Sequence, residues 1–148
     1  MEVFESAQHH KEKGEEEMSS FEKQFANKEK LELLGGEIEV VDIVPERQKT
    51  EVPALFAPGW GETEETFKDS LKVMSELGRR VISLSHARSG EAIEPLPQAE
   101  YSADELRKAL ALLKIIQEKA IDKIDVVAHS EGAINSVIAA ALQPEKIR

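Results

Sequence analysis

The sequence predicts an α/β fold, in which a parallel sheet carries helices on both faces. Short apolar runs, typical of buried strands, alternate with longer segments whose apolar residues recur at helical spacing. Right-handed crossovers place the loops that follow such strands at one edge of the sheet. Ligands of these folds bind at that edge, beyond the carboxyl ends of the strands.

The first thirty residues differ in composition from the remainder of the chain. Residues 1–30 are rich in Glu and Lys, so we expect a charged leader, partly helical or disordered, before a domain over residues 31–148. Phe21 and Phe25 would share one face of a helix in that leader. The adjacent histidines at positions 9–10 point in different directions on a helix and have no evident third partner, so we expect no metal site there.

The first expected elements of the domain are two strands and a helix. Residues 37–44 alternate as a strand does, and residues 52–57 form an apolar run typical of a strand buried on both faces. Residues 62–77 carry apolar residues at helical spacing, and Gly78 ends this helix. The sequence therefore predicts that the strand at residues 52–57 and the helix at residues 62–77 form a strand–helix unit.

The same alternation continues to the end of the chain. Residues 81–84 predict a strand, and residues 102–120 predict a long helix capped by Ser102. Residues 124–128 predict the last strand, and a helix follows until Pro144. Three loops should therefore converge at the carboxyl edge of the sheet: residues 58–61, 85–90 and 129–132.

Ser130 stands between the last expected strand and its helix. A helix N-terminus offers unpaired amides and the positive end of a dipole at this point. If the hydroxyl attacks an acyl carbon, the amide of Glu131 is placed to stabilise the oxyanion. Ala128 and Gly132 are small, as a crowded strand-to-helix turn requires. The pattern favours a nucleophilic serine over a serine that only caps the helix.

Two segments resemble motifs of the α/β-hydrolase family. The sequence AHSEG at residues 128–132 resembles its nucleophile elbow, with alanine in place of the first glycine. The sequence APGWG at residues 57–61 resembles the His-Gly loop after the family's third strand, with Pro58 where histidine is common. The resemblance spans about residues 37–148 and implies a three-layer α/β sandwich.

The resemblance also implies roles for individual residues. Ser130 would be the catalytic nucleophile, and the backbone amides of Trp60 and Glu131 would hold the oxyanion. Arg88 matches the arginine of the loop after the family's fourth strand and would brace the loops. No metal or other cofactor is expected. The substrate-binding residues would be Gly59, Gly61 and His129.

In this family, the acid and the histidine of the triad follow the serine. Residues 131–148 supply neither, so we expect the N-terminal portion of a longer hydrolase, incomplete at its C-terminal end and inactive alone. His129 is a poor base because neighbouring side chains at a sharp turn point apart. His86 lies on a convergent loop, although a hydrogen bond to backbone explains it more simply.

The expected function is serine-dependent hydrolysis of ester, thioester or amide bonds through an acyl-enzyme, with a small-molecule acyl substrate. An acyltransferase remains open, as does a non-catalytic binding module of the same fold. A phosphate-binding loop at Gly59 and Gly61 is rejected, because the lysine of a Walker loop is absent and the neighbouring glutamates would repel phosphate.

Composition restricts the partners. The formal net charge of −10 disfavours nucleic acids and anionic membranes. The chain has no cysteine, which excludes disulfides, a thiolate nucleophile and Cys-ligated zinc. We expect a cytoplasmic protein with no membrane-spanning segment and no secretory signal. The sequence leaves the oligomeric state open.

Overall fold

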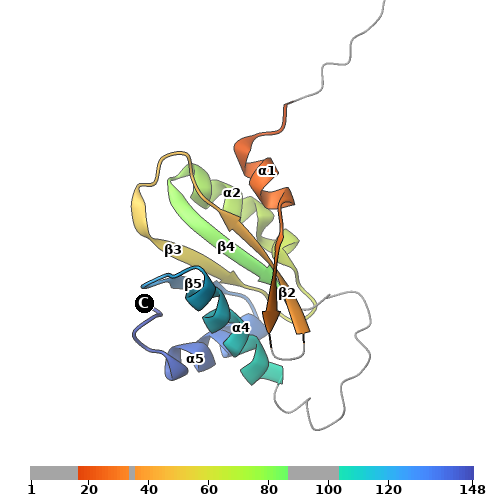
Figure 1. Cartoon of the computed structure of the whole chain (residues 1–148), viewed down its shortest axis with the longest axis vertical. Helices are drawn as coiled ribbons and strands as arrows, with labels where there is room; N and C mark the ends of the chain where they lie inside the picture. The colour runs from red at the N-terminus through yellow and green to blue at the C-terminus, as the bar shows by residue number, and fades with distance from the viewer. Residues whose placement is uncertain (1–16, 34–35, 87–103) are drawn as a thin grey trace, which may run out of the picture.

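The computed structural model describes residues 17–33, 36–86 and 104–148. Five strands form one sheet in the order β1-β2-β4-β3-β5 (Figure 1). Along the chain the elements are α1 (Ser20–Ala26), β1 (Glu29–Leu33), β2 (Gly36–Ile43), β3 (Thr50–Ala57), the 3-10 helix η1 (Glu64–Phe67), α2 (Lys68–Glu76), β4 (Arg79–Ser85), α4 (Asp104–Glu118), β5 (Asp125–Ala128) and α5 (Glu131–Leu142).

The sheet is mixed in direction. Strands β3, β4 and β5 run parallel to one another, as the alternation of strands and helices predicted. Strand β2 runs antiparallel to both β4 and β1. The sequence did not predict β1, because the residues of this strand are mostly Glu and Lys. An edge strand needs few apolar residues. In β1, Leu31 packs against the core.

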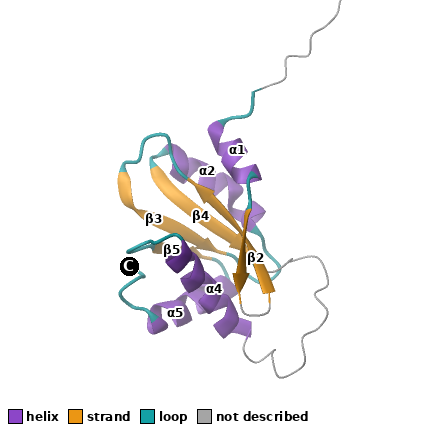
Figure 2. Cartoon of the chain, in the orientation of Figure 1, coloured by secondary structure: helices purple, strands orange, loops and turns teal. Residues whose placement is uncertain are grey.

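Helices cover both faces of the sheet (Figure 2). Side chains alternate between the faces of a strand, so Val40 and Leu55 point to one side while Val41 and Phe56 point to the other. Helices α4 and α5 pack on the Val40 side, and α1 and α2 pack on the Val41 side. This arrangement is the predicted three-layer α/β sandwich.

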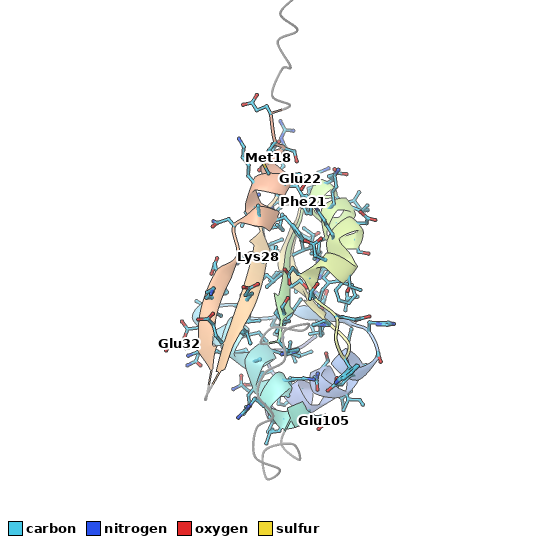
Figure 3. All side chains as sticks on the ribbon, turned by 90° about the vertical axis from the view of Figure 1, so that its right-hand side faces the viewer. Met18, Phe21, Glu22, Lys28, Glu32 and Glu105 are labelled. Carbon is cyan, nitrogen blue, oxygen red and sulfur yellow. The ribbon has the colours of Figure 1, made fainter. Side chains whose placement is uncertain are left out.

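Helix α1 packs into the folded body of the protein. Phe21 and Phe25 are 8% and 3% exposed, and their rings stack with centroids 5.7 Å apart. Figure 3 shows Phe21 on the side of α1 nearest α2, and both rings share an apolar cluster with Leu71 of α2. The predicted division of the chain at residue 30 therefore falls within β1, after a helix that is already packed.

Other expectations concern segments outside the described residues. Residues 1–16, which include both adjacent histidines, are among them, as are Arg88 and the predicted cap Ser102.

The predicted helix over residues 62–77 consists of η1 followed by α2. Among the described helices, none is both long enough and apolar enough to cross a membrane.

Candidate active site

The parallel pairing of β3 with β5 brings two of the predicted loops together. Ala57 and Ala128 are register partners at the carboxyl ends of these strands. The backbone N–H of His129 donates to the carbonyl oxygen of Ala57 at 3.2 Å, which continues the pairing one residue further. The loop at residues 58–61 and the turn at residues 129–130 therefore leave the sheet side by side.

Ser130 occupies this turn with an unusual backbone conformation. Its φ of 53° and ψ of −124° lie outside the regions that non-glycine residues favour, which costs about 1–3 kcal/mol. The residue is exposed, and its side chain makes no capping hydrogen bond at the start of α5. The hydroxyl is thus presented to solvent and is not used to cap the helix.

Two glycines allow the close packing around Ser130. A Cβ atom on Gly132 would lie 2.7 Å from the carbonyl oxygen of Pro58 and still nearer that of Ala57. A Cβ atom on Gly59 would lie 3.1 Å from the Cβ of Ser130. The loop after β3 therefore touches both the turn at Ser130 and the first turn of α5.

Residues 59–62 form a tight turn that orients the Trp60 amide. The N–H of Glu62 donates to the carbonyl oxygen of Gly59 at 3.2 Å, and Gly61 has a φ of +72°, as the third residue of a type II turn requires. The Gly59 carbonyl and the Trp60 N–H belong to one trans peptide unit and point in opposite directions. The Trp60 N–H therefore points out of the turn.

The two predicted oxyanion donors make no hydrogen bonds among the described residues. The Glu131 amide is at the first position of α5, where a helix lacks an internal acceptor. The Trp60 amide follows Gly59, which faces Ser130. Glu131 is therefore bonded directly to Ser130, and Trp60 is bonded to Gly59, which packs against Ser130.

Residues 53–148 match the family model described as the alpha/beta hydrolase fold. This chain belongs to the α/β-hydrolase fold family. The match covers well over half of the chain and confirms the predicted resemblance to this family. It includes both the loop at Trp60 and the turn at Ser130.

Solved structures share the fold of this α/β-hydrolase chain. An epoxide hydrolase from Vigna radiata superimposes with a TM-score of 0.65 at 20% identity, over 82% of this chain and 36% of that one. Epoxide Hydrolase A from Mycobacterium thermoresistibile gives a TM-score of 0.65 at 18% identity, with the same coverage of 82% and 36%. The chain therefore spans little more than a third of the length of these proteins. No curated protein sequence matches it.

Glu62 lies at the candidate site of this α/β-hydrolase chain, although the sequence did not predict it there. One carboxylate oxygen, Oε2, accepts the Gly59 N–H at 2.6 Å, and the other, Oε1, lies 2.7 Å from Nδ1 of His129. His129, predicted to bind substrate, is thus engaged through one ring nitrogen while its side chain is 63% exposed. In the sequence Glu62 resembles a solvated charge, so no signal there reveals these contacts.

A second unpredicted contact involves the side chain of Glu131. Its Oε1 lies 2.8 Å from Nζ of Lys108 on α4, and both side chains are 15% exposed. Because Glu131 directly follows Ser130, this ion pair ties the turn at Ser130 to α4. The two residues lie far apart in the sequence, and neither has a motif that predicts the pair.

A buried polar cluster lies behind the loop after β3. Glu64 is 2% exposed and binds both Lys28 and the hydroxyl of Ser85 at the end of β4. Burial disfavours the charged form of Glu64, but the hydrogen bonds from Lys28 and Ser85 outweigh it and lower the pKa of the carboxyl. His86 directly follows Ser85 and is half-buried. The cluster connects the loop after β3 with the end of β4.

The described residues offer no metal centre. Across residues 17–33, 36–86 and 104–148, the structure brings together no group of three or more His, Asp or Glu side chains that would hold a metal ion. A hollow lies elsewhere, at the C-terminal ends of α4 and α5, where Leu113, Gln117 and Gln143 line it. Ser130 precedes the opposite end of α5, so this hollow is separate from the candidate site.

Proposed function

We propose that this chain carries the nucleophile and the oxyanion donors of a serine-dependent hydrolase of ester, thioester or amide bonds. The observation that carries the proposal is the strained backbone of Ser130 at the strand-to-helix turn, with the hydroxyl exposed. Strain of this kind persists only where the surrounding structure enforces it, and it gathers at functional sites. The Gly132 packing supplies that enforcement.

In the first step, Oγ of Ser130 bonds to the acyl carbon, and the hydroxyl proton passes to a general base. The substrate carbonyl oxygen takes the negative charge, and the Trp60 and Glu131 amides donate to it. The bond to the leaving oxygen, sulfur or nitrogen then breaks, and the leaving group takes the proton from the base. The product of this step is an acyl-enzyme.

In the second step, water attacks the acyl carbon and gives one proton to the base. The same two amides hold the oxyanion again. The bond between the acyl carbon and Oγ breaks, Ser130 recovers its proton from the base, and the carboxylic acid leaves. Substitution of another alcohol, thiol or amine for water would make the protein an acyltransferase.

The general base and its acid partner lie outside these 148 residues in this proposal. Nδ1 of His129 is engaged by Glu62, and adjacent side chains at a sharp turn point apart, so His129 is a poor base for Ser130. The chain covers 36% of the length of the two epoxide hydrolases, which leaves room for both groups in a longer protein.

Two other functions are less well supported. A non-catalytic binding module has no use for a strained serine beside two amides that make no hydrogen bond within the described part of the chain. Epoxide opening is named for the solved relatives, but at 18% and 20% identity the likeness extends to the fold alone. A hydroxyl beside two amide donors favours attack on an acyl carbon, where the developing charge is on a carbonyl oxygen.

A fluorophosphonate probe tests the proposal on the natural polypeptide that carries these residues. The probe should bond covalently to Oγ of Ser130, as peptide mass spectrometry would establish. Ser130→Ala should abolish labelling, whereas Ser70→Ala, at an exposed serine of α2, should leave it unchanged. Equal labelling of the wild type and Ser130→Ala, or no labelling of either, would reject the proposal.

A further inference from the structure

We propose that Glu62 is a positioning residue, whose carboxylate joins the loop after β3 to the nucleophile turn and fixes the direction of the Trp60 amide. The inference rests on the proposed function, since it assigns that amide to the oxyanion. It concerns a side chain next to the turn at Ser130. Its evidence is two contacts of Glu62 within the described part of the chain.

The first contact closes the turn at residues 59–62 from both directions. The Glu62 N–H donates to the Gly59 carbonyl, and the Glu62 carboxylate accepts the Gly59 N–H at 2.6 Å. A hydrogen bond to a carboxylate is stronger than a neutral one. The peptide units on both sides of Gly59 are therefore held by one residue, and the following N–H, that of Trp60, cannot rotate without breaking a bond.

The second contact reaches across to the turn after β5. Oε1 of Glu62 lies 2.7 Å from Nδ1 of His129, the residue immediately before Ser130. The Glu62 side chain is 21% exposed, so water competes only in part for these contacts. One carboxylate thus holds an element of each loop, with one oxygen atom assigned to each.

The three glutamates that follow Gly61 have different environments. Glu62 points to the site, Glu64 is buried against Lys28 and Ser85, and Glu65 is exposed. The exposed residue provides a matched control of the same charge. The substitution that isolates reach from charge is Glu62→Asp, which keeps the carboxylate and shortens the side chain by one methylene.

The rate of fluorophosphonate labelling of Ser130 measures the effect, because the phosphonyl oxygen occupies the position of the oxyanion. Loss of a whole oxyanion donor costs about 100- to 1000-fold in rate. A misdirected donor should cost less, and we expect Glu62→Asp to slow labelling about tenfold or more. Glu62→Gln retains an oxygen acceptor at full reach and should stay within about threefold of the wild type. Glu65→Asp should leave the rate unchanged.

A chromogenic ester provides a second readout. A positioning role predicts a lower kcat with an unchanged KM, because the interaction acts only once the oxyanion develops. Thermal melting of each variant establishes that the fold is kept. If Glu62→Asp melts early, the comparison of Glu62→Gln with Glu62→Ala replaces it. Equal rates for those two, or for Glu62→Asp and the wild type, would overturn the inference.

Amide NMR of the same natural polypeptide separates failure of this inference from failure of the proposed function. The short bond to a carboxylate should move the Gly59 amide proton downfield, and Glu62→Asp should move it back. A wild type that shows this shift but is not labelled would reject the proposed function and keep the contact. A labelled wild type without the shift, or with a shift that Glu62→Asp leaves in place, would reject the role of Glu62.

Discussion

The Cα of Gly59 faces Ser130 so closely that a methyl group added at position 59 would lie 3.1 Å from the Cβ of the serine. Real Cβ atoms rarely approach this closely, so one of the two loops would have to shift. The added group would also lie 2.9 Å from Oε2 of Glu62, which already holds the Gly59 N–H. The packing of position 59 is therefore coupled to the geometry of the site.

Gly59→Ala should impair the site as well as the fold. The neighbours that must move are side-chain atoms of Ser130 and Glu62 and the carbonyl oxygen of His129. We expect fluorophosphonate labelling of Ser130 to fall by about tenfold or more, because the proposed oxyanion donors lose their alignment. Overpacking of this kind costs about 1–3 kcal/mol of folding free energy. Wild-type labelling by Gly59→Ala would show that the loop tolerates displacement.

Gly132→Ala should act mainly on stability. Its Cβ would meet the backbone carbonyl oxygens of Ala57 and Pro58, which belong to a buried strand end and cannot move as side chains do. We expect a loss of about 3 kcal/mol in the free energy of unfolding, at the upper end of overpacking costs. Denaturant unfolding measures it. Ala141→Val, at an exposed position of α5, should lose less than about 1 kcal/mol, and an equal loss would contradict the packing argument.

The sequence predicted what depends on neighbouring residues. Apolar runs located β3, β4 and β5, and the small residues of AHSEG and APGWG indicated where the chain turns sharply. The partners of Glu62 and Glu64 could not be predicted from the sequence. In ETEE at residues 62–65 each glutamate resembles a solvated charge, and only the folded chain brings His129 to the first and Lys28 to the third residue of the segment.

The edge strand β1 illustrates the same limit. Its pairing with β2 depends on main-chain hydrogen bonds, which any sequence can form, and only Leu31 among its described side chains packs on the core. A segment of this kind has no hydrophobic period to reveal it. Helix α1 was predicted in part from the sequence, because the spacing of Phe21 and Phe25 places both on one face of a helix.

Lys28→Met should destabilise the protein through the buried carboxylate of Glu64. Removal of one partner of a buried pair costs about 3–5 kcal/mol, and we expect about 2 kcal/mol here because the Lys28 side chain is 32% exposed. Lys23→Met, at an exposed position of α1, should change the free energy of unfolding by less than about 0.5 kcal/mol. Adding Glu64→Gln to Lys28→Met should restore part of the loss, since a neutral amide replaces the unpaired charge.

The coupling between these substitutions is the decisive quantity. Urea unfolding of the two single variants and the double variant gives an interaction energy for Lys28 and Glu64. Additive losses would show that the ion pair contributes nothing beyond its separate side chains. A Lys28→Met variant as stable as Lys23→Met would contradict the role assigned to the cluster.

Asp125 should make stability depend on pH in the acid range. The Arg148 guanidinium hydrogen-bonds the carboxylate, slight burial opposes this, and Arg79 adds a further bond, so the pKa of Asp125 is lowered from 3.8 to about 2. A carboxyl with a lowered pKa stabilises the folded state above its ordinary pKa. This stabilisation is lost as the pH falls from about 4 to about 2.

Asp125→Asn should therefore lower the melting temperature at pH 6, and the difference from the wild type should shrink toward zero near pH 2. Asp122→Asn, at an exposed residue before β5, should not show this convergence. Thermal melts across the pH series measure both differences. A constant difference at every pH would mean that the asparagine acts through packing and not through the lost charge.

Ser130→Gly should separate the cost of the strained backbone from the chemistry of the hydroxyl. Glycine adopts positive φ without the Cβ clash that Ser130 pays at φ 53°, although it also has more freedom to lose on folding. A relief of about 1–3 kcal/mol set against a loss of about 0.5–1 kcal/mol leaves a net gain near 1 kcal/mol. Ser130→Ala keeps the Cβ and therefore the strain, so its free energy of unfolding should stay close to that of the wild type. Both variants should lose labelling, but only the glycine variant should gain stability, and equal stability of the two would show that the turn holds Ser130 without strain.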